Sequence, residues 1–246
     1  MRSVEILGVR VDDVSMDEAV DRIAGYVNEP AGRPCRMIAS VNPEFIMAAR
    51  RRADFAAALS ESDLNIPDGA NLVRVARWLG RPLRERVAGS DLAPRLADRA
   101  AREGWKLFFL GGRNGVGQEA AARLVSQFQA LQVAGTFEGS PDPAEEQAIL
   151  DRVNASGATL LFVAYGAPAQ DLWICRNRDR LTARAAIGVG GTLDFIAGRI
   201  PRAPLWMQKA GLEWLFRLAR EPRRIRRQAV LVQFLWLALT ARREAA

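Results

Sequence analysis

Apolar segments typical of buried β-strands alternate with segments of helical periodicity along most of this chain. Leu107-Phe-Phe-Leu110 and Leu160-Leu-Phe-Val163 are two of these apolar segments, and a helical pattern of about 10 to 15 residues follows each. Such alternation is typical of βαβ units, whose strands form a parallel sheet. Because the strands are apolar along their length, we expect helices on both faces of the sheet. The sequence therefore predicts an α/β fold.

Cap and turn residues set the expected boundaries of these elements. Ser15-Met-Asp-Glu18 has the pattern of a capping box and predicts a helix to about Asn28. We expect a short β element at residues 4–11 and strands at residues 36–41, 64–66, 106–110, 132–137, 159–165 and 185–189. Further helices are expected from residue 43 to the mid-50s, after Gly69 to about residue 79, and at 90–103. The remaining ones are expected after Gly117 to about residue 128, at 144–154 and at 168–178.

The net positive charge is concentrated at the C-terminal end. Residues 199–246 contain 11 Lys or Arg and 3 Asp or Glu, whereas the first 198 residues contain 24 and 25. Trp206, Trp214 and Trp236 lie in the same segment. Arginines attract anionic headgroups and indole rings prefer the polar boundary of a bilayer, so this composition suits an anionic membrane surface. We therefore expect a core at residues 1–198 and a basic helical appendage at residues 199–246.

The appendage has a helical pattern and an apolar stretch near its end. One helix is expected at about 204–219, and Pro222 marks the start of the next. The apolar residues 229–241 number thirteen, fewer than the roughly 20 that span a bilayer. They suit a peripheral membrane contact, a partner helix or a homo-oligomer contact. A basic segment also suits nucleic acid, but Trp and Leu at helical spacing favour a membrane or a partner helix. A solvated basic face is the remaining interpretation.

The N-terminal sequence and the cysteine content indicate a cytoplasmic protein. The first residues lack the cationic and long apolar segments of a signal peptide. Cys35 and Cys175 are too few for a disulfide framework, so we expect reduced thiols.

Histidine is absent from the chain. This excludes Ser-His hydrolase triads and histidine zinc sites, and it removes the usual general base near neutral pH. The chain also lacks an Asp-x-Asp triplet, a pattern with which many sugar transferases hold a divalent ion. We therefore expect no metal, and we expect Arg, Lys and backbone amides to stabilise the charge on any leaving group.

Four motifs follow predicted strands, at the edge where ligands bind to parallel sheets. They are Ser40-Val-Asn42-Pro43, Pro67-Asp68-Gly69, the glycine loop Gly111-Gly-Arg-Asn-Gly-Val-Gly117, and Tyr165-Gly-Ala-Pro168-Ala-Gln170-Asp171. The glycine loop precedes a helix, so Gly111 and Gly112 are placed to present bare amides to a phosphate. A tight strand-to-helix turn explains the same glycines. Asp68 also suits a turn, Asn42 a helix cap and Gln170 a solvated surface.

Further motifs accompany these four along the chain. They are Arg86-Val-x-Gly89-Ser-Asp91-Leu, Leu110-Gly-Gly112, Gly188-Val-Gly-Gly191-x-x-Asp194-x-x-Ala-Gly198, Arg202-Ala-Pro204, Gly211-Leu-Glu213-Trp214-Leu-Phe-Arg217-Leu and Glu221-Pro-Arg-Arg224. In this order, the motifs resemble those of the WecG/TagA/CpsF glycosyltransferases, glycosyltransferase family 26. The resemblance extends over nearly the whole chain, and its last two motifs are the most specific.

The resemblance implies both a fold and a reaction. It implies a Rossmann-like core and a C-terminal appendage that helps to complete the site at the membrane. The reaction is transfer of an N-acetylhexosamine or related sugar from a UDP-sugar to a polyprenyl-diphosphate-linked sugar, with inversion and without a metal or other cofactor. Such a step belongs to the synthesis of teichoic acid, common antigen, capsule or exopolysaccharide, on the inner face of the plasma membrane.

The resemblance also assigns roles to residues. Asp68 takes the role of catalytic base on the acceptor hydroxyl, and Asn42 is the second catalytic residue beside it. The arginines of the appendage would face the diphosphates. The substrate-binding residues that the resemblance implies are Ser40, Arg86, Gly111, Gly112, Gln170, Asp194, Arg217, Arg224 and Arg227.

Two departures from the family pattern bear on the substrate. The family usually reads Pro-Lys-Gln-Glu where this chain has Pro168-Ala169-Gln170-Asp171, so a lysine contact is missing at residue 169. The loop after strand 132–137 usually has an aromatic residue near a glycine, whereas Gly139 is followed here by Ser140. A different preference for the donor follows from this change. The competing enzymatic interpretation is a nucleotide-dependent oxidoreductase, against which the lack of GxGxxG after the first strand argues.

Overall fold

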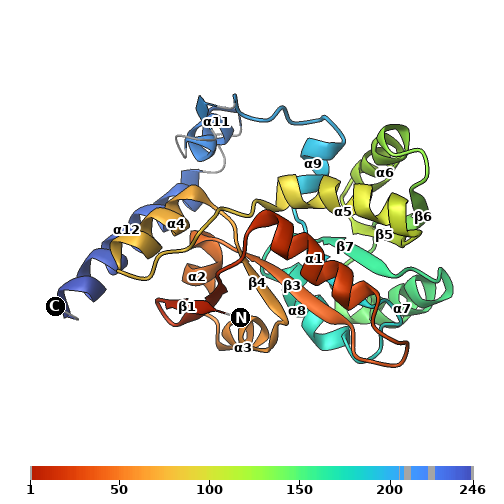
Figure 1. The fold of residues 1–246 in the computed structure, drawn as a ribbon, viewed down its shortest axis with the longest axis horizontal. Helices are drawn as coiled ribbons and strands as arrows, with labels where there is room; N and C mark the ends of the chain where they lie inside the picture. The colour runs from red at the N-terminus through yellow and green to blue at the C-terminus, as the bar shows by residue number, and fades with distance from the viewer. Residues whose placement is uncertain (1, 205, 208–211, 221–224, 245–246) are drawn as a thin grey trace.

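The computed structural model describes residues 2–204, 206–207, 212–220 and 225–244. Its centre is a six-stranded sheet with the order β4-β3-β8-β7-β5-β6, in which every neighbouring pair is parallel (Figure 1). The predicted α/β fold with a parallel sheet is therefore confirmed. The strands are β3 (Arg36–Val41), β4 (Leu64–Pro67), β5 (Lys106–Gly111), β6 (Gln132–Phe137), β7 (Leu160–Ala164) and β8 (Ala185–Gly188).

Helices flank both faces of this sheet (Figure 1). The described helices are α1 (Met16–Val27), α2 (Pro43–Ala49), α3 (Ala53–Glu61), α4 (Ala70–Trp78), α5 (Gly89–Glu103), α6 (Val116–Gln127), α7 (Glu146–Ala155), α8 (Ala169–Asn177), α9 (Thr192–Ile196), α11 (Glu213–Arg220) and α12 (Ile225–Glu244). The capping box at the start of α1 is confirmed, because Ser15 Oγ accepts from the N–H of Glu18 and Glu18 bonds back to the N–H of Ser15. The single helix expected from residue 43 is two helices, since Arg52 has extended backbone angles and starts α3.

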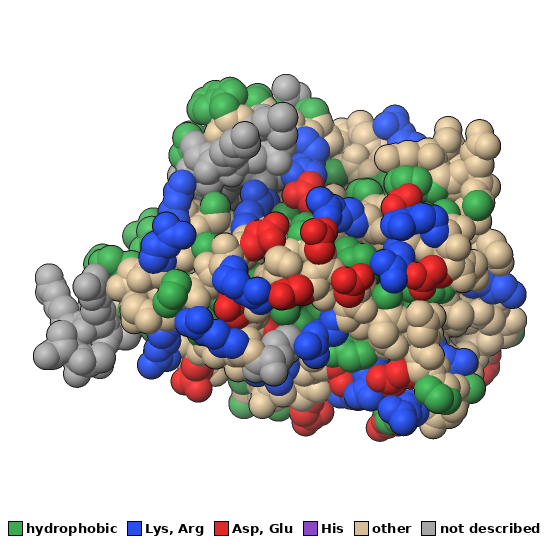
Figure 2. Space-filling view, viewed as in Figure 1, with side chains coloured by type: hydrophobic (Ala, Val, Ile, Leu, Met, Phe, Trp, Pro, Cys, Tyr) green, Lys and Arg blue, Asp and Glu red, His purple; other side chains and the backbone are tan. Residues whose placement is uncertain are grey.

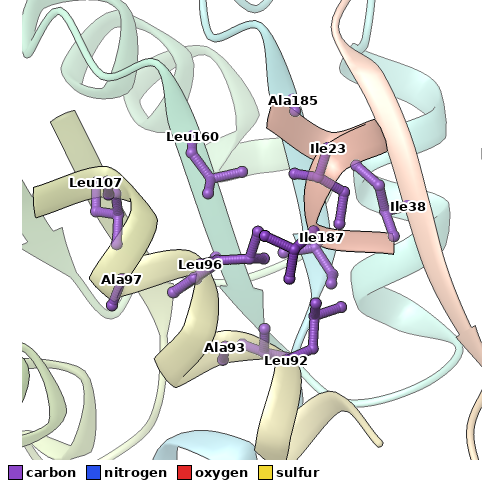
Figure 3. Close-up of a cluster of buried hydrophobic side chains, with 14 of the residues drawn as sticks. Ile23, Ile38, Leu92, Ala93, Leu96, Ala97, Leu107, Leu160, Ala185 and Ile187 are labelled. Carbon is purple, nitrogen blue, oxygen red and sulfur yellow. The ribbon is translucent and has the colours of Figure 1, made fainter. Parts of the chain in front are cut away.

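The strand side chains alternate between two apolar cores, one on each face of the sheet. In β5, Leu107 and Phe109 lie in the core under α1, α5, α6 and α9, which Figure 3 shows in part. Phe108 and Leu110 lie in the core on the other face, under α3, α7 and α8. Successive strand residues point to opposite faces, so a continuously apolar strand serves both cores. This is why these strands lack polar alternation.

A short hairpin covers the β4 edge of the sheet. It consists of β1 (Ser3–Ile6) and β2 (Val9–Asp12), which pair in antiparallel fashion. Asp12 is almost fully buried, and its carboxylate accepts a hydrogen bond of 2.8 Å from the N–H of Asn65 in β4. An unpaired N–H on an edge strand is a site for unwanted strand pairing, and this bond satisfies it.

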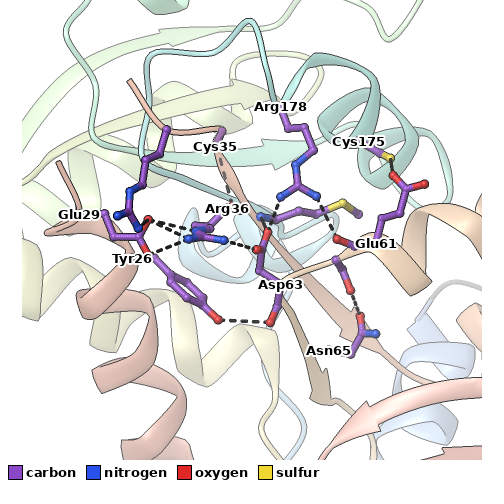
Figure 4. A network of polar contacts seen from close by, with 12 residues as sticks. Tyr26, Glu29, Cys35, Arg36, Glu61, Asp63, Asn65, Cys175 and Arg178 are labelled. Atoms are coloured by element: carbon purple, nitrogen blue, oxygen red, sulfur yellow. Dashed lines mark hydrogen bonds and ion pairs between the residues drawn. The ribbon is translucent and has the colours of Figure 1, made fainter. Parts of the chain in front are cut away.

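An ion-pair network closes the amino ends of β3 and β4 (Figure 4). Asp63, just before β4, bonds to Arg36 at 2.8 Å and to Arg178 at 2.9 Å, and it also accepts from the N–H of Met37 at 2.8 Å. Arg36 bonds in addition to Glu29, and these bonds raise the pKa of its guanidinium. The network therefore fixes the end of the sheet that lies away from the predicted ligand edge.

The C-terminal region differs from the prediction in where its helices begin. A single helix over 204–219 is wrong, because Leu212 is not helical and α11 begins at Glu213. The N–H of Leu212 donates to the carbonyl of Met207, and the carbonyl of Leu212 accepts from the N–H of Phe216. The second bond is the first helical hydrogen bond of α11, whose first residue follows Leu212.

Helix α12 packs against α2, with Phe234 and Ala238 buried in the core between them. Its other face is also apolar, and Val232 and Trp236 are 67% and 62% exposed. Figure 2 shows hydrophobic side chains gathered at the flank where α12 lies, whereas acidic and basic side chains are mixed over α1 and α5. Among the described residues, no helix is both long and apolar enough to cross a membrane.

Candidate active site

A crevice opens at the carboxyl ends of β3 and β8. These strands are neighbours, but the helices that follow them lie on opposite faces of the sheet. Phe45 of α2 lies in the core on one face, and Leu193 of α9 lies in the core on the other. Chain segments that leave adjacent strands in opposite directions create the space where α/β sheets bind ligands. The topology therefore places a ligand site between β3 and β8.

A cleft of about 390 Å³ occupies this position. It brings together residues as far apart in the chain as Ser40 and Leu231, from the ends of β3, β4 and β8, from the start of α8, from the segment that leads into α5 and from α12. The residues predicted from the sequence that line the cleft are Ser40, Asn42, Asp68, Arg86 and Gln170.

Asp68 enters the cleft from the turn that ends β4. Its N–H donates to the carbonyl of Val41 at 2.8 Å, which holds the turn beside the end of β3. Gly69 has φ +121°, a backbone angle that suits glycine, and it starts α4. The Pro-Asp-Gly sequence therefore has both of the properties considered for it: it forms a turn, and its carboxylate lines the cleft.

Three side-chain oxygens surround Gly89 at the first turn of α5. A Cβ on Gly89 would lie 3.3 Å from Ser40 Oγ, 3.7 Å from Thr192 Oγ1 and 3.8 Å from Asp68 Oδ2. Ser40 is buried, and among the described residues its hydroxyl has no hydrogen-bond partner. A buried hydroxyl without a partner is costly, so a bound polar group that pairs with Ser40 is stabilised there.

Asn42 has a structural task as well as a place in the cleft. It is the N-cap of α2, and its Oδ1 accepts a hydrogen bond of 3.1 Å from the N–H of Phe45. A cap of this kind typically contributes about 1 kcal/mol. The helix-cap interpretation is thus confirmed, and the cap fixes the direction in which the Asn42 amide faces the cleft.

Gln170 is held in the cleft wall by the loop that precedes α8. Its Oε1 accepts a hydrogen bond of 3.1 Å from the N–H of Gly166, and its side chain is 3% exposed. The interpretation of Gln170 as a solvated surface residue is therefore wrong. Burial and the bond to Gly166 fix the amide, which is a requirement for a residue that orients a substrate.

Comparison with known proteins identifies the family. A model of the glycosyl transferase WecG/TagA/CpsF family matches residues 4–246. The chain belongs to this family. A relative from Bacillus spizizenii, N-acetylglucosaminyldiphosphoundecaprenol N-acetyl-beta-D-mannosaminyltransferase, is 32% identical over 209 residues, which cover 85% of this chain and 80% of the relative. The chain is a glycosyltransferase, and the oxidoreductase interpretation is set aside.

Three of the predicted substrate-binding residues of this glycosyltransferase are not among the lining residues of the cleft as the structure describes it: Gly111, Gly112 and Asp194. A Cβ on Gly111 would lie 2.7 Å from the backbone of Ala164, so the neighbouring strand requires glycine there. Gly112 has φ +80° and approaches the backbone of Gly117. The tight-turn interpretation of the glycine loop therefore accounts for both glycines, and their role in substrate binding stays a prediction.

The arginines predicted to face the diphosphates lie in the C-terminal region. Arg217 is in α11 and Arg227 is in α12, and the structure describes their backbone but not their side chains. Arg224 lies outside the described residues. Their contacts with substrate stay predictions.

Sequence analysis did not single out several residues that line the cleft. Thr192 lies between the Gly-Gly pair and Asp194, and Ser90 follows Gly89; both belonged to recognised motifs. Phe195 adds an aromatic surface from α9. Leu231 of α12 also lines the cleft, and no local pattern in the sequence distinguishes it from its apolar neighbours. The contribution of α12 depends on how the helix packs against α2.

The described residues include no group of three or more Cys, Asp or Glu side chains arranged to hold a metal ion. Arg86 is the arginine of the core that lines the cleft, and Asp68 is the cleft-lining aspartate. The cleft therefore contains one cationic group and one anionic group among the residues that were predicted to act there. A base and an anion-binding group are the minimum for transfer from a phosphate-linked sugar.

Proposed function

We propose that this glycosyltransferase moves an N-acetylhexosamine-type sugar from a UDP-sugar to a polyprenyl-diphosphate-linked sugar, with inversion at the anomeric carbon and without a metal. The relative from Bacillus spizizenii is named for transfer of N-acetylmannosamine to N-acetylglucosaminyldiphosphoundecaprenol. A product of this kind is an intermediate of cell-surface polysaccharide or teichoic acid-type synthesis. The protein then works at the inner face of the plasma membrane.

One observation carries the proposal: Asp68 shares a cleft with a buried, unpaired hydroxyl and with the Gln170 amide. Ser40 Oγ and Asp68 Oδ2 both lie near Gly89, while Gln170 is held by Gly166 on another side of the cleft. A carboxylate can remove a proton, and a hydroxyl and an amide can hold a sugar by its hydroxyl groups. These are the functional groups that a sugar transfer needs.

The chemistry follows as a single displacement. Asp68 takes the proton of the acceptor hydroxyl as that oxygen attacks C1 of the donor sugar. The bond from C1 to the phosphate oxygen breaks at the same time, and its electron pair leaves with UDP. A positioned carboxylate base contributes roughly 10² to 10⁴ in rate. Attack from the face opposite to UDP inverts the anomeric carbon.

The departing UDP gains negative charge, which arginines can neutralise. Arg86 lines the cleft, and Arg217, Arg224 and Arg227 belong to the C-terminal region. A guanidinium remains charged at any working pH and binds phosphate oxygens through paired hydrogen bonds. In this proposal the arginines supply the charge that a divalent ion supplies in other transferases, so no cofactor is needed.

The C-terminal region connects the cleft with a membrane in this proposal. Leu231 of α12 lines the cleft, while Val232 and Trp236 of the same helix are exposed. Near an anionic leaflet each arginine contributes about 1 kcal/mol, so the four in residues 223–227 supply roughly 4 kcal/mol. That is enough for reversible docking. Docking is then coupled to completion of the site, because both involve the same helix.

Release of UDP from a panel of UDP-sugars, with a short-chain polyprenyl-diphosphate sugar as acceptor, tests this function. We expect release with a UDP-N-acetylhexosamine only when the acceptor is present, unchanged by EDTA, and a product of inverted anomeric configuration by NMR. Absence of acceptor-dependent release across the panel would contradict the proposed donor class. Loss of activity in EDTA that added Mg²⁺ restores would contradict the metal-free mechanism.

Binding to vesicles tests the membrane partner. We expect the protein to sediment with vesicles that contain anionic lipid and to remain in the supernatant with neutral vesicles, with the difference reduced by salt. Retention of nucleic acid on a filter at physiological salt, with no vesicle binding, would favour the nucleic-acid interpretation instead. The oligomeric state, measured by light scattering, decides whether the exposed face of α12 contacts a second copy.

A further inference from the structure

Asp171 is a buried carboxyl next to the cleft that the proposed chemistry does not use. It lies in the first turn of α8, directly after Gln170, and it is fully buried. Among the residues that the structure describes, neither of its carboxylate oxygens has a hydrogen-bond partner. Burying a carboxyl without a partner costs several kcal/mol if the group is charged. A residue that is retained at such a cost requires an explanation.

Gly188 shows what Asp171 touches. A Cβ on Gly188, the last residue of β8, would lie 2.9 Å from Asp171 Oδ1 and would overlap the Nε2 of Gln170. Side-chain carbon atoms are not found so close to other heavy atoms, so a side chain at residue 188 would displace the Gln170 amide and the Asp171 carboxyl. The carboxyl of Asp171 and the amide of Gln170 therefore meet over the backbone of Gly188. Gly188 itself lines the cleft.

Two contacts thus hold the two ends of the Gln170 amide. Its Oε1 accepts from the N–H of Gly166, and its Nε2 lies over Gly188 on the side of Asp171. Without a group at the position of Asp171, the space behind Nε2 would be open, and the amide could turn about its last torsion. The angles of that torsion are broadly distributed in proteins, because it has no steep intrinsic preference.

The carboxyl of Asp171 suits this position in its protonated form. Burial raises its pKa to about 7, while its own backbone N–H and the nearby Gln170 amide lower it by smaller amounts. No charged side chain contributes to this shift among the groups described, whether from α8, from the strands β3, β7 and β8 or from α3 packed against it. A neutral acid can both donate and accept a hydrogen bond beside an amide.

We propose that Asp171 is a positioning residue, which holds the NH₂ end of Gln170 against Gly188 so that the Gln170 amide presents one fixed face to the sugar in the cleft. This inference rests on the proposed function, because Gln170 acts there on a substrate.

A double-mutant cycle tests the proposal. We expect Asp171→Ala to lower kcat for UDP release about 10-fold with little change in KM for the donor, because a misplaced orienting group costs rate. Asp171→Asn, a neutral group of the same shape, should recover most of the loss. In Gln170→Ala, addition of Asp171→Ala should cost nothing further. Losses that multiply in the double variant would overturn the proposal.

Asp12 provides a matched control. It is also a buried aspartate whose pKa burial raises, but it lies in the β1–β2 hairpin and bonds to Asn65. We expect Asp12→Ala to lower the midpoint of thermal unfolding. At temperatures where this variant is folded, we expect its kcat to equal that of the wild type. An equal loss of kcat in this control would show that any lost buried carboxyl impairs turnover, and it would overturn the specific role of Asp171.

A second measurement does not depend on any substrate. The side-chain NH₂ signals of Gln170, assigned by their loss in Gln170→Ala, should be dispersed and narrow in the ¹⁵N spectrum of the wild type and of Asp171→Asn. They should move towards the positions of exposed glutamines in Asp171→Ala. Unchanged signals in a folded Asp171→Ala would overturn the role proposed for Asp171, whatever sugar the enzyme transfers. A failure of the proposed function is detected separately, as a lack of UDP release by the wild type.

Discussion

The carboxylate of Asp68 lies beside the backbone of Gly89, 3.8 Å from the point that a Cβ on Gly89 would occupy. Asp68 follows β4 and Gly89 starts α5, with α4 between them in the chain, and the N–H of Val87 donates to the carbonyl of Pro67 at 2.9 Å, which brings the start of α5 back to the end of β4. At the same point, Ser40 Oγ is 3.3 Å away. Gly89 thus leaves the first turn of α5 without a side chain at the point nearest to the predicted base. A substrate beside Asp68 can use the space that this missing side chain leaves.

Asp68→Asn tests the assignment of the base. We expect kcat to fall at least 100-fold, because the amide cannot take a proton, while the KM for the donor changes little. UDP release with the polyprenyl-linked acceptor measures both constants. The neighbouring Asp91 of α5 is exposed and bonds to Arg202, so Asp91→Asn is a suitable comparison that we expect to be far less impaired. Near-normal turnover of Asp68→Asn would reassign the role of base.

Gly89→Ala should separate activity from stability. The φ angle of Gly89 is not in the left-handed region, so alanine is compatible with this backbone, and we expect the gain from a less flexible unfolded chain to be offset by the contact of the new Cβ with Ser40 Oγ at 3.3 Å, with little net change in stability. The methyl group would crowd Ser40 and the space near Asp68, so we expect kcat/KM to fall about 10-fold or more. Urea unfolding and UDP release measure the two effects. A variant that is less stable but fully active would contradict this account of Gly89.

Asp171 should make stability depend on pH. The pKa of Asp171 is raised by burial from 3.8 to about 7 in the folded protein. The unfolded chain therefore releases this proton at lower pH than the folded protein does. The stabilisation that the folded protein gains by binding this proton is complete below about pH 4 and is lost as the pH rises through about 7. We expect the free energy of unfolding of the wild type to fall between pH 5 and pH 8 relative to Asp171→Asn. Parallel pH profiles of the two proteins would show that Asp171 does not titrate in this range.

Asp63 should be important for stability and unimportant for chemistry. Its removal breaks the bonds to Arg36, Arg178 and the N–H of Met37, so that Arg36 keeps only Glu29 and Arg178 keeps only the carbonyl of Glu61 among the bonds described. We expect Asp63→Ala to lower the free energy of unfolding by about 2 to 4 kcal/mol. At a temperature where the variant is folded, kcat should be unchanged. Asp54→Ala, which removes an exposed pair with Arg52, should have little effect on either quantity.

The two faces of α12 should respond differently to substitution. Val232→Ser together with Trp236→Ser removes exposed apolar surface, so we expect weaker sedimentation with anionic vesicles and an unchanged melting temperature. Phe234→Ala removes a fully buried ring from the core against α2 and should cost about 3 to 5 kcal/mol of stability. Vesicle sedimentation and thermal unfolding distinguish these outcomes. Full vesicle binding by the double serine variant would exclude this face as the membrane contact.

The buried face of α12 affects how a truncation should be interpreted. Deletion of the residues after about 200 would remove the whole appendage. Because Phe234 and Ala238 belong to the core against α2, such a deletion would also uncover apolar surface of the core. Loss of turnover in a truncated chain would then have two explanations. Substitutions confined to the exposed face avoid this ambiguity.

The positions of the strands along the chain could be predicted because their cause is local. Apolar runs that end at Asn42-Pro43 or at Pro67-Asp68-Gly69 have their length and their end encoded in a few adjacent residues. The same holds for the Ser15 capping box, which was confirmed. The break between α2 and α3 and the start of α11 at Glu213 were not predicted, because arginines and leucine at these positions are good helix formers and only the packing decides where the helix stops.

The sequence by itself determined the chemical groups of the cleft, since the lack of histidine leaves carboxylates as bases and the strand-end motifs supply Ser40, Asp68 and Gln170. Only the tertiary structure decided which glycines line the cleft. Gly89 lies beneath Asp68, whereas Gly111 packs against the backbone of Ala164. The tertiary structure likewise buried Asp171 and brought Leu231 to the cleft. Residue types follow from local sequence, but distances between strand ends depend on strand order, which is fixed by the packing of helices on both faces of the sheet.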